Sequence, residues 1–222
     1  KRRQPYVMSC LRRNSRPARG VPRERPLSER NLPALRSAPF RNMARSFCPL
    51  KRRNSVIYVY TGNGKGKTSA CLGQAVRAYG RGMRVAFVQF MKRDGEAGEQ
   101  AFLRNLLGGN FLAPGEGFFR REEERPRHRA AARRALDWAK SRLGQVDILI
   151  ADEILYALGK QLVQEEDIEV LLQQARKTDT HLVLSGRGFP DALAPEVDLI
   201  TEMKEIKHPW RAGHSAVPGL DF

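Results

Sequence analysis

The run of residues with the clearest chemistry is 61–68, which reads TGNGKGKT. Glycines let backbone N–H groups turn inward around phosphate oxygens. Lys67 can neutralise the outer phosphates of a nucleotide, and the Thr68 hydroxyl can bind Mg²⁺. The usual phosphate-binding pattern has glycine five residues before Gly66, whereas this chain has Thr61 there and Gly62 next. We therefore interpret the run as a variant P-loop.

The segments on either side of this run support that interpretation. Residues 56–60 are aliphatic, β-branched or aromatic and predict a buried strand, and residues 69–79 predict a helix. Such a helix adds free N–H groups and the positive end of its dipole. The alternative, a glycine-rich turn with solvated lysines, explains the strand-to-helix position less well. Seven residues are thus predicted to bind ATP: Gly62, Asn63, Gly64, Lys65, Gly66, Lys67 and Thr68. The buried stripe of the helix is expected to be Leu72, Ala75, Val76 and Tyr79.

A second polar cluster follows the apolar segment 146–151, where Asp152 and Glu153 stand side by side. We expect this segment to be a strand that lies directly beside the first one, so that both acids face the phosphates. One acid can hold the Mg²⁺ shell, and the other can orient a water molecule. The predicted metal site is therefore Thr68, Asp152 and Glu153. The alternative is a strand end capped by solvated acids.

A third polar cluster, Gly186-Arg187-Gly188, follows the predicted strand 181–185. An arginine between glycines at the carboxyl end of a strand can reach phosphates. The alternative to phosphate binding is that Arg187 is a surface residue of an ordinary turn. Lys67, Glu153 and Arg187 are the residues to which we assign catalytic roles.

Further segments complete an alternating pattern of strands and helices. Strands are expected at 85–90, 111–112 and 198–203, and helices at 100–107, 126–143, 154–159 and 165–177. The alternation predicts an α/β fold with a mainly parallel sheet and helices on both faces, in the RecA-like P-loop architecture. Ligands of such sheets bind at the carboxyl ends of the strands, where all three polar clusters fall.

Charge divides the chain of 222 residues into two parts. Residues 1–53 hold 16 of the 40 basic residues, 2 of the 24 acidic ones and 7 of the 13 prolines. This composition predicts a disordered basic extension, followed by one folded domain over 54–222. The extension has three interpretations: a tail that binds acidic partners, an organelle transit segment, or a stretch outside the functional protein, with translation starting at Met43.

Hydrophobic run lengths and cysteine content indicate the cellular compartment. No apolar run reaches transmembrane length. Cys10, Cys48 and Cys71 lack metal-ligand spacing and form no disulfide framework, so a reducing, cytoplasmic location is expected.

Several motifs resemble the ATP:corrinoid adenosyltransferase family of cobalamin biosynthesis and salvage, and together they cover residues 56–222. They are TGNGKGKTS, RAYGRGMRVAFVQFMK, Gly98-Glu99, DILIADEILYAL, LVLSGRG and DLITEMKEIKHPWRAGHSAVPGLDF. The resemblance implies that a reduced corrinoid, as Co(I), attacks C5′ of ATP and that triphosphate leaves. It further implies Mg²⁺ or Mn²⁺, a flavoprotein or other reductant for the cobalt, and a homodimer without a membrane partner.

The resemblance also bears on the corrinoid. Some members carry Phe and Trp in a GFTW-like segment that displaces the lower cobalt ligand. Here the segment reads Gly117-Phe118-Phe119-Arg120, so Phe118 matches and arginine stands in place of Trp. Core packing is the alternative role of Phe118. Longer members have an N-terminal helix over the corrinoid, a role we do not expect for the proline-rich residues 1–53.

Two other functions compete with adenosyl transfer. A P-loop ATPase or kinase would release inorganic phosphate or a phosphorylated product. A nucleic-acid-binding module would use the basic extension and bind in a salt-sensitive way. The near balance of 24 basic and 22 acidic residues in 54–222 disfavours the second.

Overall fold

The structure is a computed structural model that describes residues 55–221. The predicted basic extension, with Cys10, Cys48 and Met43, lies outside the described residues. Within them, none of the helices combines the length and the hydropathy needed to cross a membrane.

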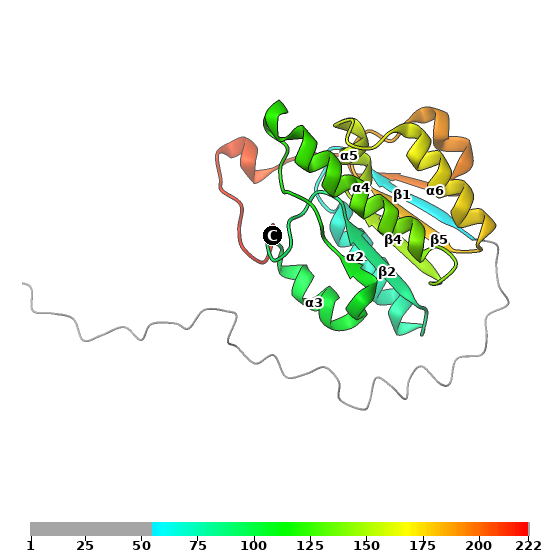
Figure 1. The fold of residues 1–222 in the computed structure, drawn as a ribbon. Helices are drawn as coiled ribbons and strands as arrows, with labels where there is room; N and C mark the ends of the chain where they lie inside the picture. The colour runs from blue at the N-terminus through cyan, green and yellow to red at the C-terminus, as the bar shows by residue number, and fades with distance from the viewer. Residues whose placement is uncertain (1–54, 222) are drawn as a thin grey trace, which may run out of the picture. The chain divides into compact units, whose positions relative to one another are not determined.

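A six-stranded sheet forms the centre of the fold, with the strand order β3-β2-β4-β5-β1-β6 (Figure 1). Every pairing is parallel, which confirms the prediction of a mainly parallel sheet. The strands are β1 (Ile57–Thr61), β2 (Val85–Gln89), β3 (Phe111–Leu112), β4 (Ile148–Asp152), β5 (His181–Ser185) and β6 (Leu199–Glu202).

The position of β4 differs from the expectation. We expected it directly beside β1, but β5 lies between them and pairs with both. Register explains why the acids still reach the phosphate loop. Ser185 at the end of β5 is level with Tyr60 of β1, and Ala151 of β4 is level with Leu184. The ends of the three strands therefore remain at one edge.

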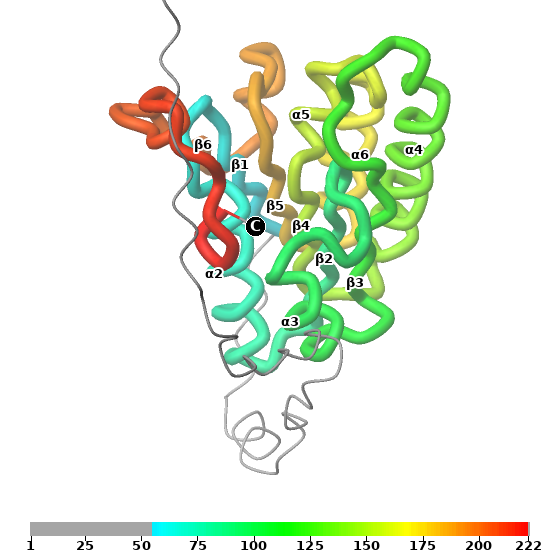
Figure 2. Tube along the Cα trace, turned by 90° about the vertical axis from the view of Figure 1, so that its left-hand side faces the viewer, coloured from blue at the N-terminus to red at the C-terminus, as the bar shows by residue number. Residues whose placement is uncertain are grey.

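Helices cover both faces of the sheet, as predicted. They are α2 (Lys67–Gly80), α3 (Gly98–Leu107), α4 (Arg125–Arg142), α5 (Ile154–Gly159) and α6 (Glu165–Lys177). Successive strand residues point to opposite faces. Val59, Leu149 and Leu184 share one core with α4, α5 and α6. The strand residues that face the other way, such as Ile150 and Val183, pack with α2 and α3. Figure 2 shows these two layers edge-on.

The buried face of α2 differs from the predicted stripe. Cys71, Ala75 and Ala78 are buried, whereas Val76 and Tyr79 are exposed. The short turn from β1 to α2 holds the helix close to the sheet, and small side chains permit this close approach. The larger residues therefore face outward, and only Ala75 of the predicted stripe is fully buried.

Candidate functional site

The predicted P-loop joins β1 to α2 and closes around the ammonium group of Lys67. Lys67 Nζ donates to the carbonyl oxygens of Gly62, at 2.9 Å, and Gly64, at 2.8 Å. The side chain is buried, and this burial lowers the pKa of Lys67. An ammonium group already held inside a loop of glycines can neutralise a bound polyphosphate without a large movement of the side chain.

Glycine is required in this loop because the chain after β6 passes close to it. Gly62 has φ +94°, and a Cβ there would lie 2.5 Å from the Met203 carbonyl oxygen. Gly64 donates its N–H to the same oxygen at 2.6 Å. The loop is thus shaped by Met203 as well as by its own sequence.

The side chain of Lys65, from the predicted P-loop, contacts the C-terminal segment. Its Nζ donates to the carbonyl oxygen of Leu220 at 2.6 Å and forms an ion pair with Asp221. The hydrogen bond from Lys65 to the Asp221 carboxylate and the one from the Val217 N–H lower the pKa of the Asp221 carboxyl. The assignment of Lys65 to phosphate binding therefore stays a prediction.

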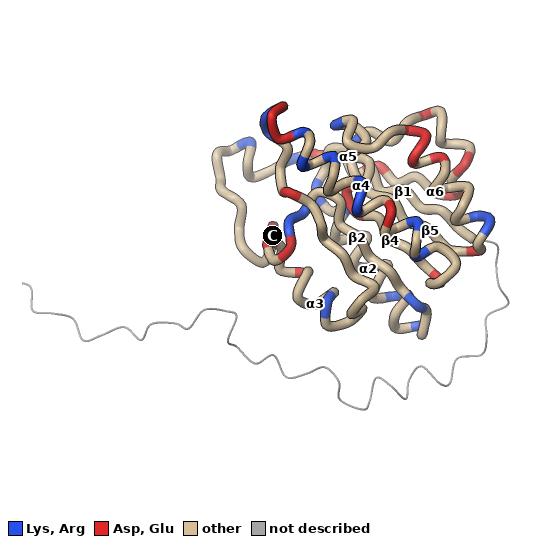
Figure 3. The backbone as a smooth tube through the Cα atoms, viewed as in Figure 1, with Lys and Arg blue, Asp and Glu red and all other residues tan. Residues whose placement is uncertain are grey.

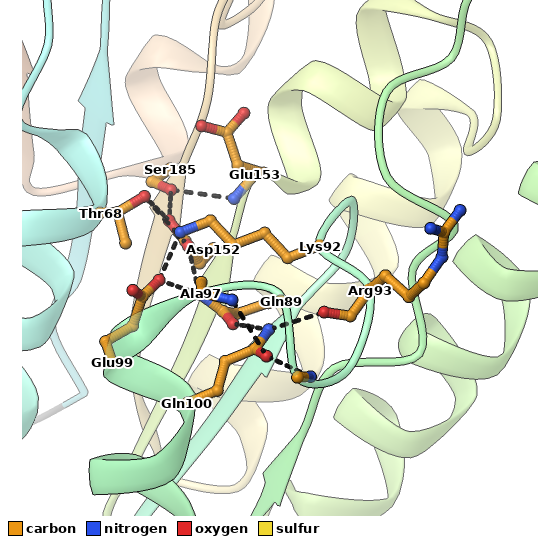
Figure 4. A network of polar contacts seen from close by, with 11 residues as sticks. Thr68, Gln89, Lys92, Arg93, Ala97, Glu99, Gln100, Asp152, Glu153 and Ser185 are labelled. Atoms are coloured by element: carbon orange, nitrogen blue, oxygen red, sulfur yellow. Dashed lines mark hydrogen bonds and ion pairs between the residues drawn. The ribbon is translucent and has the colours of Figure 1, made fainter. Parts of the chain in front are cut away.

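The acids at the end of β4 meet the start of α2. Thr68 Oγ1 lies 3.1 Å from Asp152 Oδ1 and 3.2 Å from Oδ2 (Figure 4). Ser185 Oγ donates to Asp152 Oδ1 at 2.7 Å. Asp152 is fully buried, so its carboxylate is fixed in position by these donors.

Glu153 continues the same cluster in a strained conformation. Its φ is +63°, and its N–H donates to Ser185 Oγ at 3.0 Å. Burial and the neighbouring Asp152 raise the pKa of the Glu153 carboxyl. A strained backbone and a raised carboxyl pKa at a strand end are common at functional sites.

Sequence reasoning missed a polar network beside these acids. Gln89 Nε2 donates to Asp152 Oδ2 at 3.2 Å and to Glu99 Oε1 at 3.0 Å, and Lys92 pairs with Glu99. Burial alone would raise the pKa of Glu99, but the hydrogen bonds from Lys92 and Gln89 lower it. Gln100 Nε2 donates to Gln89 Oε1 at 2.9 Å. The available signal was Gln89 itself, a polar residue inside an apolar strand.

The last two predicted residues lie toward the solvent. Arg187 is exposed after β5, and its charge lowers the pKa of both Lys67 and Glu153. Phe118 is 77% exposed, so it does not pack in the core. The Arg120 guanidinium lies 5.9 Å from the centroid of the Phe118 ring.

The Thr68 hydroxyl and the Asp152 carboxylate fit Mg²⁺. Within residues 55–221, no group of three or more His, Cys, Asp or Glu side chains could hold a metal ion. Mg²⁺ bound with a nucleotide uses one or two protein oxygens, phosphate oxygens and water. The pair therefore suits a Mg²⁺–nucleotide complex better than a metal held by the protein alone.

Figure 3 colours the backbone by residue type and shows Lys and Arg positions interspersed with Asp and Glu positions along the described body. This distribution agrees with the near balance of charge in residues 54–222. The balance of charge disfavours a nucleic-acid interface on the folded domain, because such interfaces have an excess of Lys and Arg.

Comparisons with known proteins identify relatives along most of the chain. A model of the family described as "ATP:corrinoid adenosyltransferase BtuR/CobO/CobP" matches residues 53–222. A "Corrinoid adenosyltransferase" of Pseudomonas aeruginosa is 37% identical, over 75% of this chain and 83% of that protein. Proteins with the same description from Sinorhizobium sp and Escherichia coli (strain K12) are 36% and 34% identical, over 80% and 85% of their lengths and 75% of this chain.

Solved structures give a weaker likeness. The flagellar accessory protein FlaH of Methanocaldococcus jannaschii has a TM-score of 0.42 and 14% identity, over 68% of this chain and 71% of that chain. A replication initiator DnaA bound to AMPPCP and single-stranded DNA has a TM-score of 0.36 and 19% identity, over 68% of this chain and 40% of that chain. No functional argument follows from similarities at this level.

Proposed function

The chain belongs to the ATP:corrinoid adenosyltransferase family, and from this premise we propose how its residues carry out ATP-dependent adenosylation of a corrinoid in cobalamin synthesis. The corrinoid enters reduced to Co(I). The electron pair on cobalt forms the bond to C5′ of ATP, and the C5′–oxygen bond breaks. Its electron pair leaves with the triphosphate. No general base is required, because no proton moves in this step.

Two cations suit the departing triphosphate. Lys67 lies inside the glycine loop, and Arg187 follows β5, where its charge lowers the pKa of Lys67. Preorganised positive charge at the position of the leaving group is a large source of rate enhancement. We assign the loop residues 62–68 to the phosphates, with the ribose directed toward the corrinoid so that C5′ is presented to cobalt.

The hydrogen bond between Thr68 and Asp152 is the observation that carries the proposed site. It joins the phosphate loop to the acids of β4 although β5 separates their strands. With Glu153 nearby, this pair would hold Mg²⁺ or Mn²⁺, which supplies additional neutralisation of the triphosphate when bound. Glu153 would orient a water molecule of the metal shell.

Three further proposals rest on the family. A flavoprotein or other reductant supplies Co(I), and the enzyme works in the cytoplasm. It also forms a homodimer. Strand β6 suits a protein contact, since it lies at the edge of the sheet and all four of its residues are exposed. A sedimentation mass equal to one chain of 25.1 kDa would contradict the dimer.

The test of the function supplies ATP, Mg²⁺ and chemically reduced cob(I)alamin without oxygen. The visible spectrum reports the cobalt–carbon bond, and phosphate analysis separates tripolyphosphate from ADP. We expect stoichiometric adenosylcobalamin and tripolyphosphate. Formation of ADP and inorganic phosphate alone would establish the ATPase alternative instead.

Lys67→Ala is the matched loss-of-function variant in this assay. Because it removes the buried cation that faces the phosphates, we expect the rate to fall at least 100-fold, a loss in the range seen when one such group is removed. Full activity of the variant would exclude the loop from the mechanism. An unchanged rate after removal of divalent cations would exclude the proposed metal.

A further inference from the structure

Gln89 is a polar residue in the buried interior of the sheet. It ends β2, its side chain has no exposed surface, and the other four residues of that strand are apolar and buried. An apolar side chain would suit this position better, because burying an amide costs free energy unless hydrogen bonds replace its contacts with water. The partners of the amide therefore indicate what the glutamine does.

One partner of the Gln89 amide is the Asp152 carboxylate on the neighbouring strand. The two residues are level in the pairing of β2 with β4, and Gln89 Nε2 donates to Asp152 Oδ2 at 3.2 Å (Figure 4). On the other side of β4, β5 supplies Ser185, which donates to Oδ1 at 2.7 Å. Each carboxylate oxygen thus accepts from a different neighbouring strand. Thr68 Oγ1 lies almost equally far from both oxygens, at 3.1 and 3.2 Å.

The other partners of Gln89 determine which end of its amide faces Asp152. Nε2 also donates to Glu99 Oε1 at 3.0 Å, and Gln89 Oε1 accepts from Gln100 Nε2 at 2.9 Å. The reversed amide would place its oxygen against two carboxylates, which is unfavourable because all of these atoms are acceptors. Gln100 is itself held by the loop before α3, since its Oε1 accepts from the Gly95 N–H at 2.7 Å. The network therefore presents an N–H group to Asp152.

Lys92 balances the charge of the second carboxylate in this network. Its ammonium group forms an ion pair with Glu99, and the two side chains are only 28% and 15% exposed. A partly buried ion pair is screened less by water and salt than one on the surface. Glu99 can therefore accept from Gln89 without adding net negative charge beside Asp152.

We propose that Gln89 is a positioning residue, which fixes the Asp152 carboxylate in the orientation that binds the metal of a Mg²⁺–nucleotide complex. This inference rests on the proposed function, in which Thr68 and Asp152 hold that metal. Gln89 acts through Asp152 and does not contact the metal itself. Loss of such a partner of a metal ligand typically weakens metal binding about 10- to 100-fold. Removal of the amide should thus weaken binding of the metal–nucleotide complex and leave binding of metal-free ATP nearly unchanged.

The experiment compares the full-length protein with Gln89→Met, which keeps a side chain of similar size and removes the N–H donor. ATP binding is measured by equilibrium dialysis without corrinoid, once with excess Mn²⁺ and once with EDTA. We expect the Kd with Mn²⁺ to rise about tenfold, and the Kd with EDTA to stay within about twofold. In the complete reaction, the KM for Mn²⁺–ATP should rise by the same factor, whereas kcat at saturation should change much less.

Gln74→Met is the matched control. Gln74 is also a half-buried glutamine whose Nε2 donates to a protein oxygen, the Tyr60 hydroxyl at 2.8 Å, but it has no bond to the network of Asp152. Its Kd values should equal those of the parent protein. Far-UV circular dichroism establishes first that each variant is folded.

Glu99→Leu is the second variant, for use if Gln89→Met does not fold. It removes the other acceptor of the same amide from the first turn of α3, outside the sheet. Its Kd with Mn²⁺ should also rise, and the rise should persist at high salt, because a change of geometry is not screened as a change of surface charge is.

An unchanged Kd with Mn²⁺ in the folded variant would overturn the inference. Equal weakening with Mn²⁺ and with EDTA would also overturn it, because general damage to the site, and not the metal, would then explain the loss. These outcomes leave the proposed function intact. A parent protein whose ATP affinity does not depend on Mn²⁺ would instead overturn the metal site of the proposed function, and the positioning role with it.

Discussion

Glu153 is held where its charge is unfavourable. Burial and the adjacent Asp152 raise the pKa of its carboxyl, and the attraction of Lys67, Lys92 and Arg187 only partly offsets them. A glutamate with a pKa above its unfolded value destabilises the fold once it ionises. The cost is absent below the unfolded pKa, about 4.3, and grows as pH rises through that value toward the folded pKa.

Glu153→Gln should therefore stabilise the ligand-free protein at neutral pH. We expect the Tm at pH 7.5 to rise by about 2–4 °C, the shift that about 1 kcal/mol produces in a chain of this size. The gain should disappear near pH 4, where the Glu153 carboxyl is largely protonated in both the folded and the unfolded protein. Thermal unfolding monitored by circular dichroism across pH measures it.

Glu123→Gln serves as the control for this prediction, because Glu123 is exposed and its variant should leave the Tm unchanged. The same Glu153→Gln protein should lose adenosyl-transfer activity if the carboxylate has a catalytic role. A Tm that falls at every pH would show that the carboxylate stabilises the fold instead of straining it.

At the scale of elements, two glycines of the β1–α2 unit have opposite requirements. Gly62 has φ +94° and lies against the Met203 backbone, whereas a Cβ at Gly73, in the middle of α2, would meet nothing within 4 Å. Glycine is thus required by tertiary contact at the first position. At the second it only lowers the stability of the helix.

We expect Gly73→Ala to increase the free energy of unfolding by about 0.5–1 kcal/mol. Gly62→Ala should decrease it by about 1–3 kcal/mol, because the new Cβ adds backbone strain and displaces Met203. Urea denaturation of both variants measures the difference, and ATP binding should weaken only in Gly62→Ala. Equal effects of the two substitutions would show that Met203 does not constrain the loop.

At the scale of the whole molecule, most of the excess positive charge lies in a different part of the chain from the predicted catalytic residues. The first 53 residues hold 16 basic and 2 acidic residues, and all residues of the proposed site lie at or beyond Gly62. The family relationship likewise begins at residue 53. The domain over 54–222 is therefore proposed to contain the complete catalytic unit.

Deletion of residues 1–42, which leaves a chain that starts at Met43, should change kcat and both KM values by less than twofold. Salt-sensitive binding to nucleic acid, if the full chain shows any, should weaken strongly, since residues 1–42 hold 12 basic and 2 acidic residues and so carry +10 of the net charge of +16. Steady-state kinetics and binding at two salt concentrations measure these effects. A large rise in the corrinoid KM would assign the extension to the corrinoid site.

The sequence predicted features that depend on neighbouring residues and missed features that depend on contacts between distant segments. Helix α6 and strand β5 have the predicted bounds, because hydrophobic periodicity over a dozen residues is a local signal. The outward position of Val76 and the place of β5 between β1 and β4 were not predicted. Both depend on how closely separate elements pack, which no local pattern encodes.

The sequence by itself determined the order of elements, the phosphate loop and the family, because these are carried by neighbouring residues and by motifs in a fixed order. Only the tertiary structure decided that Gln89, Lys92 and Glu99 join Asp152, and that Trp210 borders the same pocket as Phe118. The physical reason is that side-chain contact across distant segments is set by strand register and by the path of loops. Residue spacing along the chain does not specify either.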